Sequence, residues 1–173
     1  MARTKKMIEE IIKNAEYAHP NNDMYHGAWV ENGNQYVTDG YRMVMVYEPV
    51  DVKERDSEFT LSVQKKIDEL EHDCTETITL PTVKEIRSQI TELIGKRYRS
   101  EGVCYRIGDS TDLAVVNAKY LVECMEAIGA TKIKYNPLKP RMCPLYMETK
   151  IGKAILCPIA VNIDKIGFWK RYI

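Results

Sequence analysis

Apolar residues recur at helical spacing in four segments of this chain. The segments are residues 4–18, 61–72, 82–94 and 117–128. Each has one apolar stripe and an opposite polar face, although the stripe in residues 61–72 is weak. Asn117 stands at a helix N-cap position and Gly129 follows the last apolar residue, while Thr82 and Glu85 have the spacing of a capping box. The pattern therefore predicts four helices.

Strand-forming residues fill most of the sequence between these helices. The strand-like segments are residues 25–31, 35–38, 42–47, 76–80, 112–116, 131–135, 145–149 and 154–161. The pair Asn32–Gly33 suits the two positive-φ positions of a type I′ turn, and Asp39–Gly40 suits a second tight turn. Residues 25–47 are therefore expected to form an antiparallel meander. Residues 150–153 connect the last two strands, and the mixture of helices and antiparallel strands predicts an α+β fold.

The length of 173 residues suits one ordinary domain or two small ones, and the 45% apolar and 29% charged content is typical of a globular protein. No apolar run approaches the roughly 20 residues of a membrane span, and residues 1–6 lack the apolar stretch of a secretory signal. Five cysteines, none of them in a C-x-x-C pair, argue against a disulfide framework. We therefore expect a cytoplasmic protein with no membrane partner.

The charges balance over the whole chain but not along it. There are 25 Lys and Arg residues against 25 Asp and Glu residues, so no overall positive excess points to nucleic acid. Residues 1–100 hold 14 basic and 18 acidic side chains, whereas residues 101–173 hold 11 and 7. Much of the acidic excess lies in residues 51–73. Two interpretations stay open: a solvated loop and helix face, or a molecule with one acidic and one basic side.

No motif for catalysis or cofactor binding stands out. Residues 71–74, Glu-His-Asp-Cys, come nearest to a metal site, but adjacent side chains cannot all face one ion, and His19 and His26 do not complete the set. Neither phosphate-binding glycine motif occurs among the nine glycines, and no local motif supports a Cys–His nucleophile pair. We therefore expect no enzymatic activity, no metal and no cofactor.

Three features remain that suit a binding partner. The first is the turn at residues 38–42, Thr-Asp-Gly-Tyr-Arg, which by itself is an ordinary tight turn. The second is a set of basic side chains on the predicted helices, each of which also fits a solvated surface: Lys5, Lys6, Lys13, Arg87 and Lys119. The third is the aromatic and basic segment at residues 162–173, which either stacks on bases, anchors in a partner's pocket or docks on its own core.

Two stretches of the chain, taken in order, resemble the bacterial DNA sliding clamp, the processivity subunit of the replicative polymerase. Residues 37–43, Val-Thr-Asp-Gly-Tyr-Arg-Met, are similar to the clamp's T-D-G-H-R-L turn. Residues 116–122, Val-Asn-Ala-Lys-Tyr-Leu-Val, are similar to its F-N-x-x-Y-L-L helix start. Residues 144–147 and 155–159 then resemble its S-P-x-x-I strand and its closing x-x-M-P-V/M. The shared order and spacing of these short motifs carry the resemblance.

The resemblance implies a DNA-clamp-like fold of helices packed on an antiparallel sheet. It places one clamp-like domain at residues 1–161, with an insertion at about 50–111 that carries two helices, and a tail at residues 162–173. An alternative takes residues 78–94 as a first strand–helix unit and gives two compressed subdomains. Because 173 residues are few for a clamp of three subdomains, the chain looks like a short clamp-like protein of a phage or mobile element, and a homo-oligomer is a possible assembly.

By the same resemblance, the clamp's partner-peptide pocket falls on the turn and the final strand. The matching positions are Thr38, Gly40, Tyr41, Arg42, Met43, Ile155 and Cys157. Here Tyr41 replaces the usual His, and Cys157 replaces the usual Met. A clamp also contacts duplex DNA through basic helix faces without reading bases, and such binding depends strongly on salt. The positions that would take this role are Lys5, Lys6, Lys13 and Lys119.

Two functional hypotheses follow from the resemblance. The first is a sliding-clamp-like accessory or processivity protein of DNA replication that binds duplex DNA non-specifically through its basic helix faces. The alternative is a protein-binding module with the clamp fold that forms no ring, and that engages or competes for the clamp-binding peptides of a polymerase or other partner. Neither hypothesis needs a catalytic residue or a cofactor.

Overall fold

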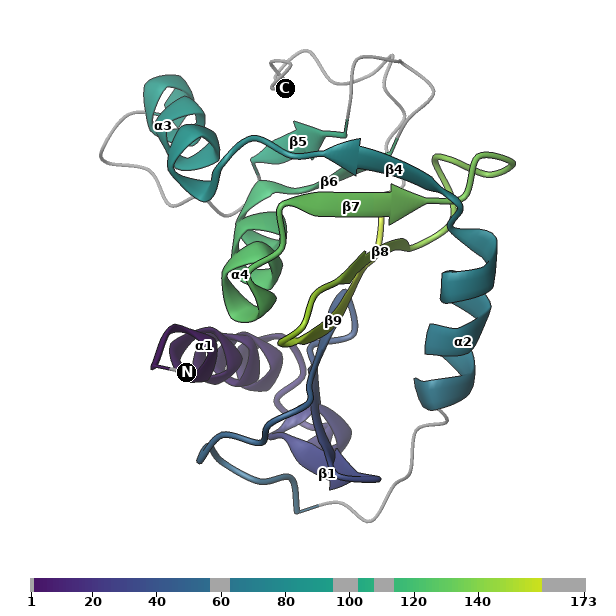
Figure 1. Cartoon of the computed structure of the whole chain (residues 1–173). Coiled ribbons are helices and arrows are strands. Elements are labelled where there is room, and N and C mark those ends of the chain that lie inside the picture. Colours follow the sequence, from purple (N-terminus) through teal and green to yellow (C-terminus); the bar gives the residue numbers. More distant parts are fainter. Residues whose placement is uncertain (1, 57–62, 95–102, 108–113, 160–173) are drawn as a thin grey trace.

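The computed structural model describes residues 2–56, 63–94, 103–107 and 114–159 (Figure 1). The helices within these residues are α1 (Ala2–Ala18), the short 3-10 helix η1 (Asp23–Tyr25), α2 (Val63–Asp73), α3 (Val83–Ile94) and α4 (Ala118–Ile128). The strands of the main sheet are β1 (Trp29–Glu31), β2 (Asn34–Thr38), β3 (Arg42–Val46), β4 (Glu76–Thr79), β7 (Lys132–Tyr135), β8 (Leu145–Glu148) and β9 (Gly152–Leu156). A separate two-stranded sheet consists of β5 (Cys104–Arg106) and β6 (Val115–Asn117).

The main sheet is antiparallel throughout, in the order β1-β2-β3-β9-β8-β7-β4. At its centre β3 pairs with β9, so that Arg42 lies opposite Leu156 and Met43 lies opposite Ile155. This pair joins the first meander, β1-β2-β3, to the last, β7-β8-β9. The turn that precedes β3 consequently lies beside the end of β9.

Helices cover both faces of the sheet. The helices α1 and α4 pack together on one face, and α2 lies on the opposite face (Figure 1). Along β3, Val44 and Val46 enter the core under α1 and α4, whereas Met43 and Met45 enter the cluster under α2. Because both faces are buried, the strand reads as a continuous apolar run after Arg42 instead of alternating with polar residues.

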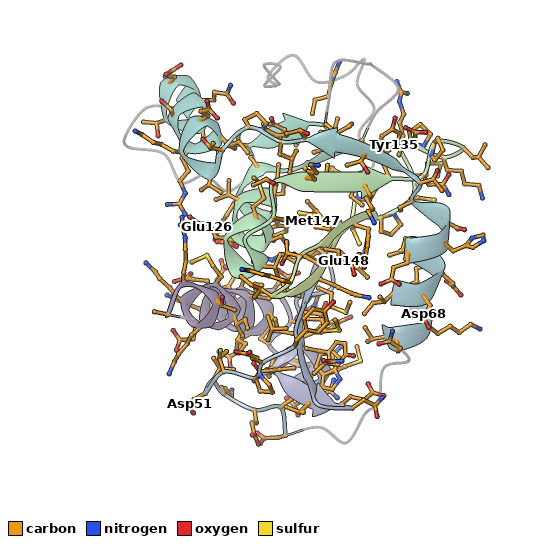
Figure 2. All side chains as sticks on the ribbon, in the orientation of Figure 1. Asp51, Asp68, Glu126, Tyr135, Met147 and Glu148 are labelled. Atoms are coloured by element: carbon orange, nitrogen blue, oxygen red, sulfur yellow. The ribbon has the colours of Figure 1, made fainter. Side chains whose placement is uncertain are left out.

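The central helix α4 is buried along almost its whole length, because α1, α3 and the sheet surround it. Two carboxylates, Glu123 and Glu126, are buried with it and need partners. Glu126, labelled in Figure 2, accepts a bond from Arg3 on α1, and its second oxygen accepts one from Arg87 Nη2 on α3 at 2.7 Å. Glu126 thereby links three helices through ion pairs.

The helix ends predicted from capping residues are confirmed. The Asn117 side chain accepts two backbone N–H bonds, at 2.9 and 3.3 Å, and Gly129 ends α4 with a left-handed φ of +70°. Thr82 and Glu85 form the capping box, with the Thr82 N–H donating to Glu85 at 2.7 Å and the Glu85 N–H donating back at 3.2 Å. The pair Asn32–Gly33 has the two positive φ values, +50° and +81°, that the predicted hairpin turn requires.

The first strand is shorter than predicted. The sequence pattern starts it at Tyr25, but that residue belongs to η1, because the Asn22 side chain accepts a backbone N–H at 3.2 Å and turns the chain there. The strand β1 begins only at Trp29. Between them Gly27 has φ +138°, and a Cβ there would lie 2.6 Å from the Glu54 backbone. The close approach of the Gly27 and Glu54 backbones, which the apolar pattern does not reveal, therefore accounts for the later start of β1.

The end of the sheet near β9 also differs from the prediction. The sequence pattern places Gly152 in a connection, whereas it is the first residue of β9 and lies opposite Val46. A Cβ at this position would lie 2.0 Å from the Met45 carbonyl oxygen, so only glycine allows β9 to approach β3 here. The strand β5 is absent from the prediction; it pairs with β6 through Cys104 and Asn117.

Residues 50–111, predicted as an insertion, supply α2, β4, α3 and β5. The strand β4 extends the main sheet by pairing with β7, and α3 packs on α4. The proposed domain boundaries stay a prediction, and the predicted tail at residues 162–173 lies outside the described residues. Within the described ranges, no helix combines the length and apolar character needed to cross a membrane.

Candidate functional site

The turn at residues 38–42 is held in shape by its own side chains. The Asp39 carboxylate accepts the backbone N–H groups of Tyr41 and Arg42, both at 3.1 Å. The Thr38 hydroxyl donates to the Arg42 carbonyl at 2.7 Å and accepts the Gly40 N–H at 3.1 Å. Gly40 has φ +85°, a conformation that favours glycine. The Thr-Asp-Gly sequence is therefore what determines the shape of this turn.

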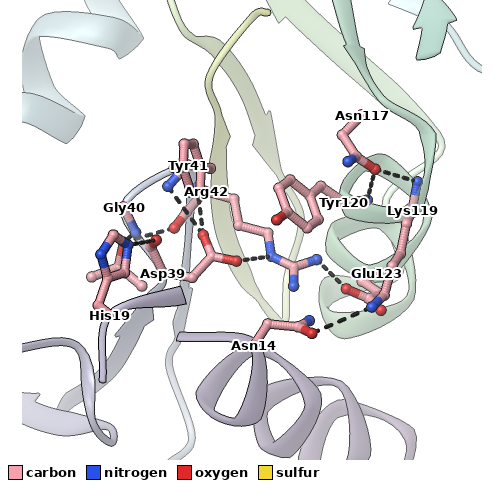
Figure 3. A network of polar contacts seen from close by, with 11 residues as sticks. Asn14, His19, Asp39, Gly40, Tyr41, Arg42, Asn117, Lys119, Tyr120 and Glu123 are labelled. Carbon is pink, nitrogen blue, oxygen red and sulfur yellow. Dashed lines mark hydrogen bonds and ion pairs between the residues drawn. The ribbon is translucent and has the colours of Figure 1, made fainter. Parts of the chain in front are cut away.

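The Arg42 side chain ties the turn to α4. Its guanidinium, in a side chain that is 0% exposed, donates from Nε to Asp39 Oδ2 at 3.0 Å and from Nη1 to Glu123 Oε2 (Figure 3). Its Cζ atom also lies 4.2 Å from the centroid of the Tyr120 ring. Charge-assisted hydrogen bonds of this kind are short and directional. The turn, β3 and α4 are consequently fixed relative to one another.

Burial and neighbouring charges act in opposite directions on this guanidinium. Burial lowers the pKa of Arg42, but the anionic forms of Cys124, Asp39 and Glu123 raise it by more, so the net pKa lies above its ordinary value. The Cys124 thiol is itself buried, which raises its pKa to about 12, and it is neutral at physiological pH. Asp39 and Glu123 are therefore the anions that face a permanently charged Arg42.

Aromatic rings extend this network to the segment that follows α1. The His19 ring stacks on Tyr25 with 4.4 Å between centroids, and its Nε2 lies 3.0 Å from the Asp39 carbonyl oxygen. The Tyr41 ring lies 6.2 Å from the His19 ring and 6.2 Å from the Tyr120 ring, centroid to centroid. Tyr41 is nevertheless 51% exposed. The Tyr41 ring is therefore accessible on the outer side of the turn, while the His19 and Tyr120 rings lie beside it.

A groove of about 310 Å³ opens beside the turn, between the ends of β3 and β9 and the first turn of α2. We call it the turn groove and define it by the residues that line it: Tyr25, Thr38, Gly40, Arg42, Met43, Val63, Lys66, Pro144, Ile155 and Cys157. Met43 and Ile155 are neighbours across the β3–β9 pair and are each 7% exposed. The lining is mainly apolar and includes two cationic residues and no acidic one.

The structure brings together six of the seven residues that the sequence assigns to a peptide pocket. The six are Thr38, Gly40, Arg42, Met43, Ile155 and Cys157. Their convergence follows from the register of β3 and β9, and from the bond that the Cys157 N–H donates to the Tyr41 carbonyl at 2.9 Å. The seventh, Tyr41, is not among the lining residues, because its ring lies on the aromatic stack outside the groove.

Four lining residues are missed by the sequence prediction: Tyr25, Val63, Lys66 and Pro144. Pro144 begins the strand motif that resembles the clamp, so the motif itself could have found it. Val63 and Lys66 belong to α2, and a helical stripe does not tell which face of a distant sheet it will cover. Tyr25 is predicted as part of a strand, and its place follows from the capping of η1.

The four lysines assigned to DNA contacts lie on α1 and α4 in unlike environments. Lys6 and Lys13 are exposed on α1. Lys5 is partly exposed and pairs with two carboxylates, at 3.4 and 4.0 Å. Lys119 is half-buried beside α1, where its ammonium donates to Asn14 Oδ1 at 3.3 Å (Figure 3). The exposed pair on α1 is therefore the part of this set best placed to meet a partner.

Groups suited to metal binding do not converge in the described residues. Among them no group of three or more His, Cys, Asp or Glu side chains is arranged to hold a metal ion. In the segment 71–74, His72 is exposed and bonds Asp73 at 3.1 Å, whereas Cys74 is buried. Burial raises the pKa of the Cys74 thiol to about 11, which keeps it protonated and poorly reactive.

Comparison with solved structures finds bacterial clamps. The crystal structure of the Helicobacter pylori beta clamp bound to a DNA ligase peptide matches with a TM-score of 0.53 and 12% identity, over 88% of this chain and 63% of that chain. The DNA polymerase III beta subunit of Thermotoga maritima matches with 0.49 and 13%, over 91% and 63%. The polymerase beta subunit of Streptococcus pyogenes matches with 0.46 and 13%, over 91% and 64%. No protein-family model and no curated protein matches the chain.

The likeness to the Helicobacter pylori clamp confirms the predicted fold, a DNA-clamp-like arrangement of helices on an antiparallel sheet. At 12% identity it concerns the fold alone. This chain spans less than two thirds of the length of each of the three clamps.

Proposed function

We propose that this chain is a clamp-like accessory protein of DNA replication whose turn groove binds a short extended segment of a partner protein. The observation that carries the proposal is the convergence of six residues on one open groove. The sequence alone matches each of these residues to a clamp motif. The clamp-like fold supports it, because the groove lies where the turn motif and the final strand of that fold meet.

The groove offers the contacts that recognition of an extended segment needs. Met43, Val63 and Ile155 supply apolar surface, and a large apolar side chain buried there would gain about 1.5–3 kcal/mol. Lys66 adds a cationic group to the lining. Because the Arg42 network already holds the turn, little conformational entropy would be lost on binding, which favours affinity.

A solved clamp indicates the kind of partner. The Helicobacter pylori beta clamp was crystallised with a DNA ligase peptide, which is a ligand of that protein. By analogy we propose that this chain binds a comparable segment of a protein that acts on DNA, such as a polymerase. The analogy rests on the shared fold and on the turn groove described above.

Fluorescence polarisation with a labelled copy of that DNA ligase peptide tests the proposal. The informative variant is Cys157→Phe, because Cys157 is half-buried in the groove lining and a phenyl ring there would fill part of the 310 Å³. We expect the unmodified chain to bind the probe and Cys157→Phe to weaken binding about tenfold or more, a change of about 1.4 kcal/mol.

The matched control is Cys143→Phe, the same substitution at a half-buried cysteine that does not line the groove. This variant should bind the probe as the unmodified chain does, and thermal melts of both variants check that they fold. Equal affinity of the two variants for the probe would show that the peptide binds elsewhere.

Contact with duplex DNA is a second candidate function, favoured by the exposure of Lys6 and Lys13 on α1. They are seven residues apart and therefore share one helix face. Glu9 is exposed on the same helix, which is why we place this function second. Each phosphate contact contributes a slope of about −0.9 to the dependence of log affinity on log salt.

Changing both lysines to glutamate should therefore weaken binding to a duplex and reduce the salt slope by about two. Lys84→Glu, at an exposed lysine on α3, is the control for a charge reversal on another helix, with half the change of charge. A salt slope that is the same in all three proteins would exclude α1 as the DNA-binding surface.

The mode of assembly belongs to the same proposal. Because the chain spans 63% of the Helicobacter pylori clamp chain, a ring of comparable size would need more copies of it than of a full-length clamp. We propose a cytoplasmic replication protein of the short phage or mobile-element type that encircles DNA only as an oligomer. Light scattering decides this point: a monomer at working concentration would exclude encirclement and leave the peptide-binding role.

A further inference from the structure

The chain passes along the turn groove just before the described residues end. Cys157 lines the groove, and its N–H bonds the Tyr41 carbonyl at 2.9 Å. Two residues later, the Ile159 N–H bonds the Val115 carbonyl at 2.7 Å. Two residues span about 7 Å at most, so the sequence that follows Ile159 starts close to the groove wall.

That sequence, residues 160–173, carries an apolar pattern suited to the groove. It includes Ile166, Gly167 and Phe168 in succession. In an extended segment, side chains two positions apart point to the same side. Ile166 and Phe168 could therefore enter one groove together, against Met43 and Ile155, while Gly167 adds no bulk between them.

The connection is long enough for this contact. Residues 160–165 separate Ile159 from Ile166 and span at most about 20 Å when extended. The groove lining includes Cys157, so the chain would only need to double back over that distance. A short tether also gives a local concentration in the millimolar range. The segment of another copy would reach this concentration only in a millimolar solution.

The charges near the groove do not select this occupant. The helix α2 contributes Val63 and Lys66 to the groove and exposes Asp68 and Glu69 on its surface. The segment that follows Ile159 contains three basic residues against one acidic residue. Residues 163–169 themselves hold one acidic and one basic residue and are neutral, so burial of their apolar side chains, and not charge, would hold them in the groove.

We propose that residues 163–169 of this same chain occupy the turn groove when no partner is bound, and that a partner's segment must displace them. The inference rests on the proposed function, because it assigns a competitor to a groove already proposed to bind peptides. The groove would then be blocked by an aliphatic and aromatic segment of its own chain until a partner displaces that segment.

The expected size of the effect follows from the fraction of free grooves. With a local concentration of about 1 mM and a dissociation constant of about 0.1 mM for the segment, roughly one groove in ten is free. The apparent dissociation constant of a partner's segment is its intrinsic value divided by that fraction. A partner should therefore bind about tenfold more weakly to the self-occupied chain than to an open groove.

Polarisation titrations with the labelled DNA ligase peptide test this on the full chain. Phe168→Ser removes the ring that would enter the groove, and we expect it to tighten probe binding about tenfold. Tyr172→Ser, the matched control, removes an aromatic ring outside residues 163–169 and should leave the affinity unchanged. A synthetic peptide of residues 160–173 should displace the probe from the Phe168→Ser chain, and the same peptide carrying Phe168→Ser should not.

The outcomes separate this inference from the proposed function. Equal affinity of the unmodified and Phe168→Ser chains for the probe would overturn self-inhibition and leave the groove's function intact. If no chain binds the probe, the proposed function is wrong. In that case a labelled peptide of residues 160–173 replaces the DNA ligase peptide as the probe. Binding of that peptide to the Phe168→Ser chain, lost on adding Cys157→Phe, would still support the inference, and no binding would overturn it.

The same titrations decide which copy supplies the segment. Occupation by the same chain makes the effect of Phe168→Ser independent of protein concentration. An effect that grows with protein concentration, together with a doubled mass in light scattering, would assign the occupant to a second copy and overturn the same-chain arrangement.

Discussion

Arg42 is among the largest fully buried side chains in the described part of the molecule. A buried guanidinium is tolerated only when anions and hydrogen bonds compensate for the lost water. The sequence marks Arg42 and Asp39 as members of one turn motif, so half of this compensation is predictable. The other half comes from Glu123, 81 residues further along the chain, and depends on how α4 packs beside β3. No local pattern reveals such a partner.

Replacing Arg42 by alanine should therefore be costly. Asp39 and Glu123 would remain buried without their cation, and breaking a buried ion pair in this way typically lowers the free energy of unfolding by about 3–5 kcal/mol. Urea denaturation followed by circular dichroism measures the change. Lys53→Ala is the control, because Lys53 pairs with Glu16 at the surface and such pairs contribute about 1 kcal/mol or less. A similar small loss for both variants would contradict the role assigned to Arg42.

Glu71 on α2 makes the stability of the fold depend on pH in the acidic range. It accepts a bond from the Tyr146 hydroxyl at 2.6 Å and is paired with Lys153 on β9. Burial raises the pKa of Glu71, but Lys153 and Tyr146 outweigh this effect, so its pKa lies below its ordinary value. A carboxylate with a lower pKa in the folded chain than in the unfolded chain stabilises the fold above the unfolded value. That contribution is lost as the pH falls through the folded value.

We therefore expect the unmodified chain to lose more stability than Glu71→Gln as the pH falls below the ordinary pKa of a glutamate, about 4.3, while the difference between them is constant near neutral pH. Thermal melts across this range provide the comparison. Glu69→Gln, at an exposed carboxylate of the same helix, should follow the unmodified chain. Parallel curves for the unmodified chain and Glu71→Gln would show that the Lys153 and Tyr146 contacts do not stabilise the fold.

A helix or strand could be predicted from the sequence where the residues that determine it are close together in the chain. The starts of α3 and α4 are predicted because each is capped by side chains within three residues. The face that α2 covers is not predictable in this way, because its apolar positions meet Tyr36, Met45 and Tyr146 on strands far away in the sequence. The strand β5 is missed for the same reason: three residues are too few for a period, and its pairing with β6 is what defines it.

The cap of α4 offers a prediction at this scale. Asn117→Ala removes the acceptor of two backbone N–H groups at the start of the helix, which typically costs about 0.5–2 kcal/mol. Asn117→Asp keeps an acceptor and adds a favourable charge at the helix N-terminus, so it should retain most of the stability. Urea denaturation compares the two. If Asn117→Asp were as unstable as Asn117→Ala, the amide would have a role other than capping.

At the scale of the molecule, the β3–β9 pair holds the two meanders in one sheet, and both hydrophobic clusters continue across it. The clamp-like architecture could be predicted from motif order, because the motifs stand at the ends of elements that the fold brings together. The place of β4 at the edge of the same sheet could not, since its partner β7 is chosen by the path of the chain through α2 and α3.

Because both meanders share this central pair, the molecule should unfold in one cooperative transition. Trp29 reports on the first meander, where it stacks on Tyr36 with 5.4 Å between ring centroids. In a Trp169→Phe chain it is the remaining tryptophan. Its fluorescence and the far-ultraviolet circular dichroism should give one midpoint in urea. An earlier midpoint for Trp29 would show that the first meander unfolds by itself.

The two outer strands of the main sheet are unlike one another, which restricts how copies could extend it. In the described part of the chain, β1 pairs with β2 alone among the strands, although residues 53–55 bond Ala28 just before it, and β4 pairs only with β7. A contact between β1 of one copy and β4 of the next would be head-to-tail, and each added copy would present the same outer strand again. Such growth stops only when the rotation between neighbours closes a ring, and otherwise continues as a filament. The twist of the sheet, more than the length of the chain, would then decide how many copies an assembly holds.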